Sequence, residues 1–161
     1  MIDQNLKDLT FNIIIDDASH KSEDVIATFE LMFYRVRPGG LYIIEDLHTS
    51  YWKSHNGGYK ASQSQIEYLK NLVDLLNVYH IRKDDEWASD NKEFYNRLPE
   101  KDKDLFVWIN SITFYDNVAV IEKLKHPRNG SYARKVVGTK QPIIPSIDIA
   151  KEHEYYHNPS K

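Results

Sequence analysis

Two pairs of acidic residues follow two short apolar runs in this chain of 161 residues. Asp16 and Asp17 follow the first run, and Glu45 and Asp46 follow the second. Carboxylates that crowd together repel one another unless a cation or shared protons relieve the repulsion. The pattern therefore predicts a divalent metal site, provided that the fold brings both pairs to one place. The alternative interpretation is that these residues are solvated strand ends or helix caps.

The two apolar runs predict β-strands buried on both faces, the kind found in a parallel sheet with helices on either side. They occupy residues 11–15 and 41–44. Between them we expect a helix over residues 22–35, capped by Ser22, and then a Pro-Gly-Gly connection at residues 38–40. The strands of such a unit run parallel and side by side, so both acidic pairs would meet at the edge where α/β sheets bind ligands.

A polar, aromatic loop over residues 47–61 follows the second acidic pair. Loops of this length beside a strand's carboxyl end are more often functional than idle. Tyr51 and Trp52 in this loop form either an apolar wall against a sugar or aromatic ring, or packing that holds the loop down. A second helix is expected over residues 62–77. Its predicted buried stripe consists of Ile66, Leu69, Val73 and Leu76.

The sequence pattern of the second half of the chain predicts fewer helices and strands. Residues 80–104 are highly charged and predict a surface excursion with a short helix near residues 93–98. The β-like runs 112–115 and 118–121 are separated by an Asp-Asn pair and predict a tight hairpin, with one long bulged strand as the alternative.

The domain predicted from these elements is incomplete. None of the six glycines forms a G-x-G-x-x-G or G-x-x-x-x-G-K loop. Two parallel strands, two helices and a hairpin are also too few for a full doubly wound domain. We expect a partial domain over residues 1–125 and an extended tail over residues 126–161, where prolines are frequent and apolar anchors are few.

Composition restricts the class of partner. The chain is 41% apolar and 28% charged, which is typical of one globular domain. A net charge of -3 without a long basic run gives no electrostatic reason to expect nucleic acid or an anionic membrane surface as the partner. There is no cysteine, no membrane-length apolar stretch and no secretory signal pattern. We therefore expect a cytoplasmic protein that acts on a small molecule.

Three segments resemble the back half of the metal-dependent class I S-adenosylmethionine methyltransferases. They are residues 13–20, residues 37–47 and the pair Tyr51-Trp52. The look-alikes are the macrolide-sugar O-methyltransferases of the mycinamicin type and the related cephalosporin-hydroxylase-like proteins. The resemblance covers roughly residues 3–125. It implies the carboxyl half of a Rossmann-like α/β sheet, with parallel strands and a terminal antiparallel hairpin but with the front strands absent.

The resemblance also implies roles for individual residues. Asp17, Glu45 and Asp46 would bind Mg²⁺, and His20 would be the general base. Ala18 stands where family members usually have glycine, a departure that bears on the conformation of the His20 loop.

S-adenosylmethionine would be the second cofactor, with most of its site in the absent front half. Asp3-Gln4 resembles the short motif that lies near the cofactor's adenine, and Asp16 at the end of the first strand would add a contact. The side chain of Asp16 should leave the strand on the opposite face from Asp17, so its role as a metal ligand stays open.

The chemistry agrees with these roles. Mg²⁺ prefers oxygen ligands and keeps coordination positions for water or substrate, so two neighbouring hydroxyls can chelate it. A neutral imidazole such as that of His20 can then remove the hydroxyl proton. We expect a Mg²⁺-dependent O-methyltransferase of a sugar or catechol-like small molecule, incomplete as this chain. The alternatives are a non-catalytic or truncated domain that needs a partner chain, and a hydroxylase-like relative. Homo-oligomerisation, or association with a chain that carries the front half, is expected.

Overall fold

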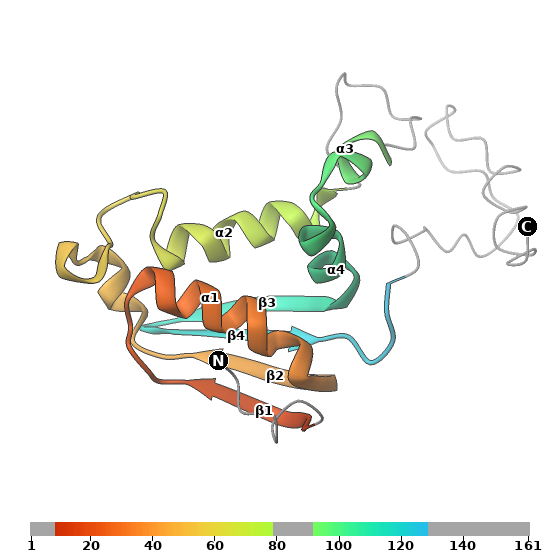
Figure 1. The fold of residues 1–161 in the computed structure, drawn as a ribbon, viewed down its shortest axis with the longest axis horizontal. Coiled ribbons are helices and arrows are strands. Elements are labelled where there is room, and N and C mark those ends of the chain that lie inside the picture. Colours follow the sequence, from red (N-terminus) through yellow and green to blue (C-terminus); the bar gives the residue numbers. More distant parts are fainter. Residues whose placement is uncertain (1–8, 79–91, 129–161) are drawn as a thin grey trace, which may run out of the picture. The chain divides into compact units, whose positions relative to one another are not determined.

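The computed structural model describes residues 9–78 and 92–128 (Figure 1). Asp3, Gln4 and nearly all of the predicted tail therefore lie outside the described residues. The chain divides into two units, residues 1–77 with 98–129 and residues 78–97 with 130–161. The first unit holds every described element except α3. In chain order the elements are β1 (Phe11–Asp16), α1 (Ser22–Met32), η2 (Phe33–Arg35), β2 (Val36–Ile44), η3 (Leu47–Tyr51), η4 (Lys53–His55), α2 (Gln65–Leu76), α3 (Lys92–Arg97), α4 (Glu100–Trp108), β3 (Ile109–Tyr115) and β4 (Val118–Lys123).

The first unit is a small α/β domain built on a mixed four-stranded sheet. The strand order is β1-β2-β4-β3, with β1 parallel to β2 and the other neighbours antiparallel (Figure 1). The predicted parallel pair and the predicted hairpin are both confirmed. Asp116 and Asn117 form the two-residue turn of the hairpin, and Asn117 takes the left-handed conformation that asparagine tolerates, with φ 63°.

Strand β2 begins earlier than the sequence predicts. Residues 38–40 were expected to be a connection, but they lie within β2 as an irregularity in its pairing with β1. Gly39 has φ +79°, and a Cβ on Gly40 would lie 2.5 Å from the carbonyl oxygen of Asn12. The two glycines therefore permit a bulge in which β2 bends against β1 without losing the sheet.

Helices α1 and α2 lie on one face of the sheet (Figure 1). Phe29 of α1 is buried at the centre of this layer, with its ring 5.2 Å from Phe33 and 5.2 Å from Tyr42 of β2 in an edge-to-face arrangement. Aromatic pairs in this geometry stabilise a core beyond the area that they bury. This layer holds the central strands and helices in one rigid arrangement.

The opposite face of the sheet is more open than predicted. Ile13 is 53% exposed and Ile15 is 57% exposed, so the prediction that β1 is buried on both faces is wrong. These side chains leave the sheet on the same side as their pairing partners Leu41 and Ile43 of β2. Among the described residues no helix covers this side, and β1 is an edge strand. The molecule therefore presents an apolar strip there.

The helices differ from the prediction in detail. In α2 the buried residues include Leu72 and Leu75, whereas Val73 is exposed, so the predicted stripe is displaced after Leu69. Lys21, not Ser22, occupies the cap position of α1, and its side chain makes no capping bond. The first residues of helix α4 fall in the segment that was predicted to be a surface excursion. Most of its residues are charged, so the sequence pattern did not indicate that α4 buries Leu105 and Phe106.

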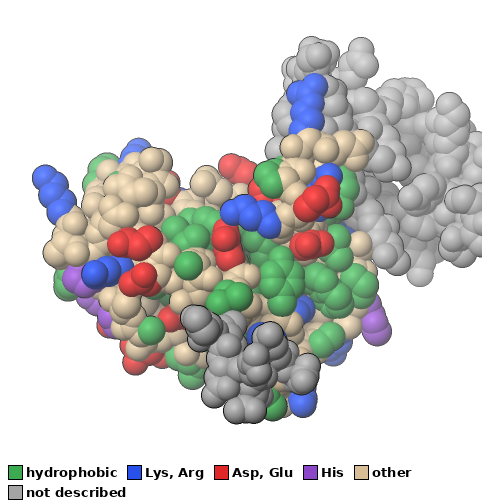
Figure 2. Space-filling view, in the orientation of Figure 1, with side chains coloured by type: hydrophobic (Ala, Val, Ile, Leu, Met, Phe, Trp, Pro, Cys, Tyr) green, Lys and Arg blue, Asp and Glu red, His purple; other side chains and the backbone are tan. Residues whose placement is uncertain are grey.

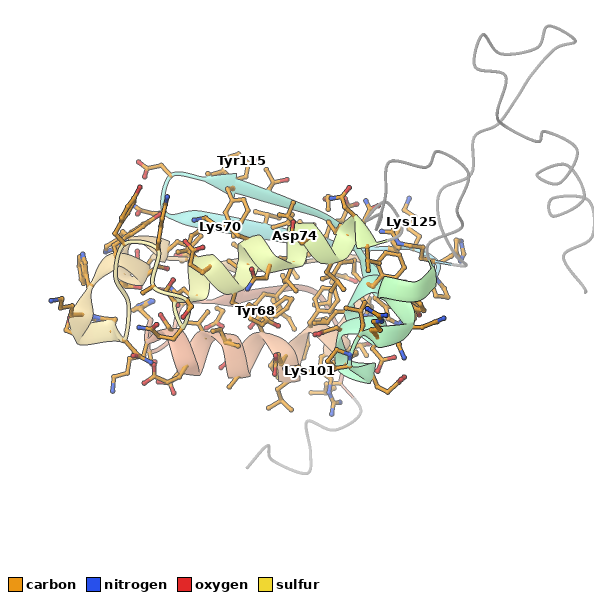
Figure 3. All side chains as sticks on the ribbon, turned by 90° about the horizontal axis from the view of Figure 1, so that it is seen from above. Tyr68, Lys70, Asp74, Lys101, Tyr115 and Lys125 are labelled. Atoms are coloured by element: carbon orange, nitrogen blue, oxygen red, sulfur yellow. The ribbon has the colours of Figure 1, made fainter. Side chains whose placement is uncertain are left out.

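Helices α1, α2 and α4 meet at one carboxylate. Glu30 of α1 accepts a hydrogen bond from the Tyr68 hydroxyl at 3.2 Å and pairs with Lys101 at 2.9 Å. Figure 3 shows Tyr68 and Lys101 on the helices that flank this contact. Burial raises the pKa of Tyr68, so its hydroxyl remains a donor.

None of the helices in the described ranges has both the length and the apolar character needed to cross a membrane.

A buried lysine joins the end of α1 to the sheet. Nζ of Lys123 donates hydrogen bonds to the carbonyl oxygens of Phe33, Tyr34 and Val36, at 3.3, 3.3 and 2.8 Å. The ammonium group also lies 5.3 Å from the centre of the Phe33 ring and 5.0 Å from that of Trp108. Burial lowers the pKa of Lys123. These contacts fix the turn that leads from α1 into the bulged start of β2.

Replacing Lys123 with methionine should destabilise the fold by about 1–3 kcal/mol, because buried carbonyl groups lose their donor. The folded state binds the Lys123 proton less tightly than the unfolded chain does, since its pKa is lowered on folding. The free energy of unfolding of the wild type should therefore increase relative to that of Lys123→Met as the pH rises toward about 10.4, the pKa of lysine in the unfolded chain. Denaturant unfolding at several pH values measures both effects. The exposed Lys125→Met is the control, and equal stability of the two variants would contradict the role of Lys123.

Candidate functional site

The carboxyl ends of β1 and β2 meet, as the sequence predicts. Asp16 pairs with Ile44 in the parallel register, and the backbone N–H of Glu45 donates to the carbonyl oxygen of Asp16 at 3.1 Å, just beyond the strands. Asp17 follows directly after β1, and Asp46 is the second residue after β2, next to Glu45, so each lies where its strand leads into a loop at this edge. Figure 2 shows acidic and histidine side chains together at the end of the molecule where the two strands stop.

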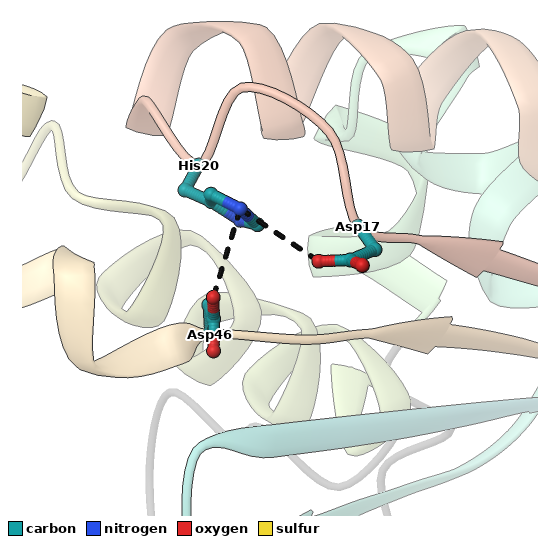
Figure 4. Close-up of side chains that lie close together, drawn as sticks. All are labelled: Asp17, His20 and Asp46. Atoms are coloured by element: carbon teal, nitrogen blue, oxygen red, sulfur yellow. Dashed lines mark ion pairs between the residues drawn. The ribbon is translucent and has the colours of Figure 1, made fainter.

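Three predicted residues converge at this edge (Figure 4). His20 Nε2 lies 3.7 Å from an oxygen of Asp17 and 3.6 Å from an oxygen of Asp46. The imidazole is 23% exposed, and the carboxylates are 61% and 47% exposed, respectively. The site is thus partly sheltered on the histidine side and open to solvent on the carboxylate side, where a ligand can approach.

The backbone is strained at two of these three residues. His20 and Asp46 adopt the left-handed conformation, with φ 57° and φ 53°. This conformation costs of order 1–2 kcal/mol for a residue other than glycine. Strain of this kind concentrates at functional sites, where the surrounding structure holds it in place. The surrounding structure therefore holds both loops in conformations that orient these side chains at a cost in backbone energy.

Ligand atoms of Asp17, His20 and Asp46 lie within 4.8 Å of one another, close enough to hold one metal ion. Two carboxylates on an open surface fit Mg²⁺ or Mn²⁺, which favour oxygen ligands and retain water. Glu45 stands next to Asp46 at the same strand end, but within the described ranges its carboxylate is not part of this close group. The structure thus brings together two of the three predicted carboxylate ligands and the predicted base.

Asp16 points away from the cluster into the fold. Its side chain is buried, and one carboxylate oxygen accepts a hydrogen bond from the Tyr42 hydroxyl at 3.0 Å. Burial raises the pKa of Asp16 above its ordinary value, although the Tyr42 hydrogen bond acts in the opposite direction. Asp16 also borders a hollow of about 280 Å³ with Ala18 and Ser19. The separation of Asp16 and Asp17 onto opposite faces agrees with the prediction.

Sequence reasoning did not single out Tyr42. A signal was present, because Tyr42 lies two residues before Ile44 and therefore on the same buried face of the strand, and a buried tyrosine hydroxyl usually needs a partner.

The loop after Asp46 carries the predicted aromatic residues. Trp52 packs between His48 and His55, with ring centres 4.7 and 5.4 Å away. Nδ1 of His48 lies 3.8 Å from Asp46. Both Tyr51 and Trp52 remain 48% exposed, so each combines loop packing with an open surface.

Tyr51 borders a hollow of about 470 Å³ beside the cluster. The hairpin contributes Phe114 and Tyr115 to its wall, and α2 contributes Lys70. Figure 3 labels Lys70 on α2 and Tyr115 on the hairpin. The hollow therefore has aromatic surfaces on two sides and lies next to His48, which adjoins the acidic cluster.

Comparison with known proteins finds a set of sugar O-methyltransferases. The chain is 33% identical over 124 residues to 8-demethyl-8-alpha-L-rhamnosyl tetracenomycin-C 2'-O-methyltransferase of Streptomyces olivaceus, covering 76% of this chain and 29% of that protein. It is also 33% identical over 124 residues to mycinamicin VI 2''-O-methyltransferase of Micromonospora griseorubida, covering 74% and 28%. No protein-family model matches the chain.

Solved structures give the same result. The MycE methyltransferase from the mycinamycin biosynthetic pathway, in complex with Mg and SAH, superposes with a TM-score of 0.57 at 29% identity, covering 89% of this chain and 32% of that one. A second crystal form of that complex gives a TM-score of 0.54 at 31% identity, covering 77% and 28%. The chain spans less than a third of the length of these relatives. The resemblance predicted from the sequence is confirmed over this part.

Replacing Tyr42 with phenylalanine should destabilise the fold by about 1.5–3 kcal/mol, the range for a hydrogen bond to a charged group. The variant keeps the ring in the core but removes the donor that faces the buried Asp16 carboxylate. Thermal and denaturant unfolding measure the loss, with the exposed Tyr115→Phe as the control. Unchanged stability in Tyr42→Phe would show that the hydroxyl does not support Asp16.

Proposed function

This chain is homologous to a segment of the mycinamicin-type sugar O-methyltransferases, and on that premise we propose that it forms the metal-binding part of a Mg²⁺-dependent O-methyltransferase. The observation that carries the proposal is the convergence of Asp17, His20 and Asp46 at the carboxyl ends of two adjacent parallel strands. Ligands of open α/β sheets bind at this edge. His20 and Asp46 both adopt the left-handed conformation there, and strained backbone of this kind clusters at functional sites, which supports the proposal.

The residues take distinct roles in this proposal. Asp17 and Asp46 hold the ion, and Glu45 is the third carboxylate because it adjoins Asp46 at the same strand end. When bound, Mg²⁺ lowers the pKa of a coordinated hydroxyl and orients it. His20 would accept the hydroxyl proton, since its Nε2 lies 3.7 Å and 3.6 Å from the carboxylates of Asp17 and Asp46, which would hold the ion. The two carboxylates beside it stabilise the imidazolium that results.

The acceptor in this proposal is a small molecule with neighbouring hydroxyls on a sugar ring. Two observations support a sugar. The relatives are named for rhamnosyl tetracenomycin-C and mycinamicin VI as acceptors, and the hollow near His48 has the aromatic walls that suit the apolar face of a sugar. Tyr51 stands at the edge of this hollow and Trp52 lies in the same loop, so we assign them to the acceptor.

S-adenosylmethionine is the proposed methyl donor, because the related structures contain SAH, the product that it leaves after methyl transfer. Asp16, beneath the first strand end, and Asp3 and Gln4 are proposed to serve the cofactor side. The remaining contacts to the cofactor would come from a further protein segment or from a partner chain. The uncovered apolar strip at Ile13 and Ile15 supports such a partner segment or chain, packed there as in a complete doubly wound sheet. If none is present, the domain is a non-catalytic relative.

The metal assignment predicts that the wild-type chain binds Mn²⁺ and that Asp17→Asn or Asp46→Asn weakens binding at least tenfold. Each substitution removes a charged ligand while keeping the shape of the side chain. Titration calorimetry measures the affinity, and Asp74→Asn on the exposed side of α2 is the control. Wild-type affinity in both cluster variants would refute the site.

The base assignment predicts a loss of about 10²–10⁴-fold in kcat for His20→Ala. A suitable enzyme is a hybrid in which this chain replaces the homologous segment of mycinamicin VI 2''-O-methyltransferase. Affinity for S-adenosylmethionine should stay unchanged, because His20 faces the carboxylates. The exposed His126→Ala serves as the control. A hybrid with His20→Ala that retains full activity would rule out this histidine as the base.

A further inference from the structure

One buried hydroxyl contacts both loops of the acidic cluster. Oγ1 of Thr49 lies 3.0 Å from the carbonyl oxygen of His20 and 2.8 Å from that of Asp46. These are the two residues of the cluster that adopt the left-handed conformation, and they belong to different loops. Thr49 is 3% exposed. Its hydroxyl therefore lies behind the cluster, on the side away from solvent.

A buried glutamine supports this hydroxyl. Gln65, the first residue of α2, is 1% exposed, and its Nε2 donates to Thr49 Oγ1 at 3.1 Å. Because the threonine oxygen accepts this bond, its single proton is left for one carbonyl oxygen. The Asp46 carbonyl already accepts from the Thr49 N–H at 3.1 Å, so the hydroxyl proton is available to the His20 carbonyl of the other loop. Thr49 itself belongs to the loop after Asp46, so the connection runs from the buried first residue of α2 through this loop to the His20 carbonyl.

We propose that Thr49 and Gln65 are positioning residues that fix the separation between the Asp17–His20 loop and Asp46. Neither side chain is a candidate metal ligand, and both act through backbone carbonyls. The backbone bond from Glu45 to Asp16 sets the register of the strand ends, and Thr49 extends this link to the first residues that leave the sheet. Hydrogen bonds of this kind hold a site in its binding geometry before the ligand arrives.

The inference rests on the proposed function for its effect on metal affinity, but not for its effect on the loops. Thr49→Val keeps the size and β-branching of the side chain while removing the hydroxyl, and Thr49→Ser restores the hydroxyl. Gln65→Met removes the donor from the second residue. Ser50→Ala is the matched control, because Ser50 is a neighbouring buried residue whose hydroxyl has no hydrogen-bond partner among the described residues.

Two measurements on the full chain test the inference. The first is the Mn²⁺ affinity, which should fall about 10–100-fold in Thr49→Val, the range for residues that orient ligands. The second is amide hydrogen exchange in the metal-free chain, which should accelerate in residues 17–20 and 46–49. Gln65→Met should act in the same direction, whereas Thr49→Ser and Ser50→Ala should resemble the wild type in both measurements.

The outcomes separate the inference from the proposed function. A wild-type chain that does not bind Mn²⁺ refutes the metal proposal, and the exchange data then decide the positioning role alone. Exchange in Thr49→Val that matches the wild type in both loops overturns the positioning role, whatever the metal affinity. A similar loss of Mn²⁺ affinity in Ser50→Ala and Thr49→Val also overturns it, because the effect would then come from general disturbance of the η3 turn.

Discussion

The parallel pairing of β1 with β2 is the constraint on which the rest of the site depends. Because parallel neighbours end at the same edge, Asp17 and Asp46 come to lie in one place although they are 29 positions apart in the sequence. Their carboxylates then lie around the His20 imidazole. Sheet geometry thus concentrates negative charge at this edge, and a cation or a proton relieves the repulsion between the carboxylates.

The surrounding elements keep this edge in place. The hairpin turn holds the second loop directly, since the Leu47 N–H donates to the carbonyl oxygen of Asn117 at 2.9 Å. Helix α1 starts from the first loop and packs Phe29 onto β2. Strain at His20 and Asp46 is therefore balanced by contacts from both sides of the sheet edge. The arrangement is typical of a functional site, where strained backbone lowers the folding stability but holds the side chains in a defined geometry.

Sequence patterns predict much of this arrangement, because they report on local properties. Apolar runs ending in acidic pairs predicted the strand ends, and the Asp-Asn pair predicted the hairpin. Sequence patterns did not predict contacts between segments that are far apart in the chain. The bulge at Gly39 and Gly40 depends on the close approach of β1, and the burial of α4 depends on two apolar residues in a charged helix. The exposure of Ile15 likewise depends on what covers the sheet, which strand composition does not report.

The site could likewise be predicted where it depends on the strand ends, but not where it depends on long-range packing. Residue types at the strand ends identified the two acidic pairs, and the family resemblance singled out Asp17, Asp46 and His20, which the structure brings together. The supports were not identified, because Thr49 and Gln65 lie 16 positions apart and meet only through the packing of α2 against η3. Glu45, the third proposed carboxylate, lies outside this close group among the described residues, because the direction of a side chain is set by contacts that spacing does not report.

The most direct test of the account is the position of a bound ion. Crystals of the chain grown with Mn²⁺ should show an anomalous-scattering peak at the carboxyl ends of β1 and β2, within coordination distance of Asp17 and Asp46. The His20 imidazole should lie beside the ion but remain uncoordinated, so that it is free to accept a proton. A peak at another location, or one coordinated directly by His20 in place of either carboxylate, would contradict the account.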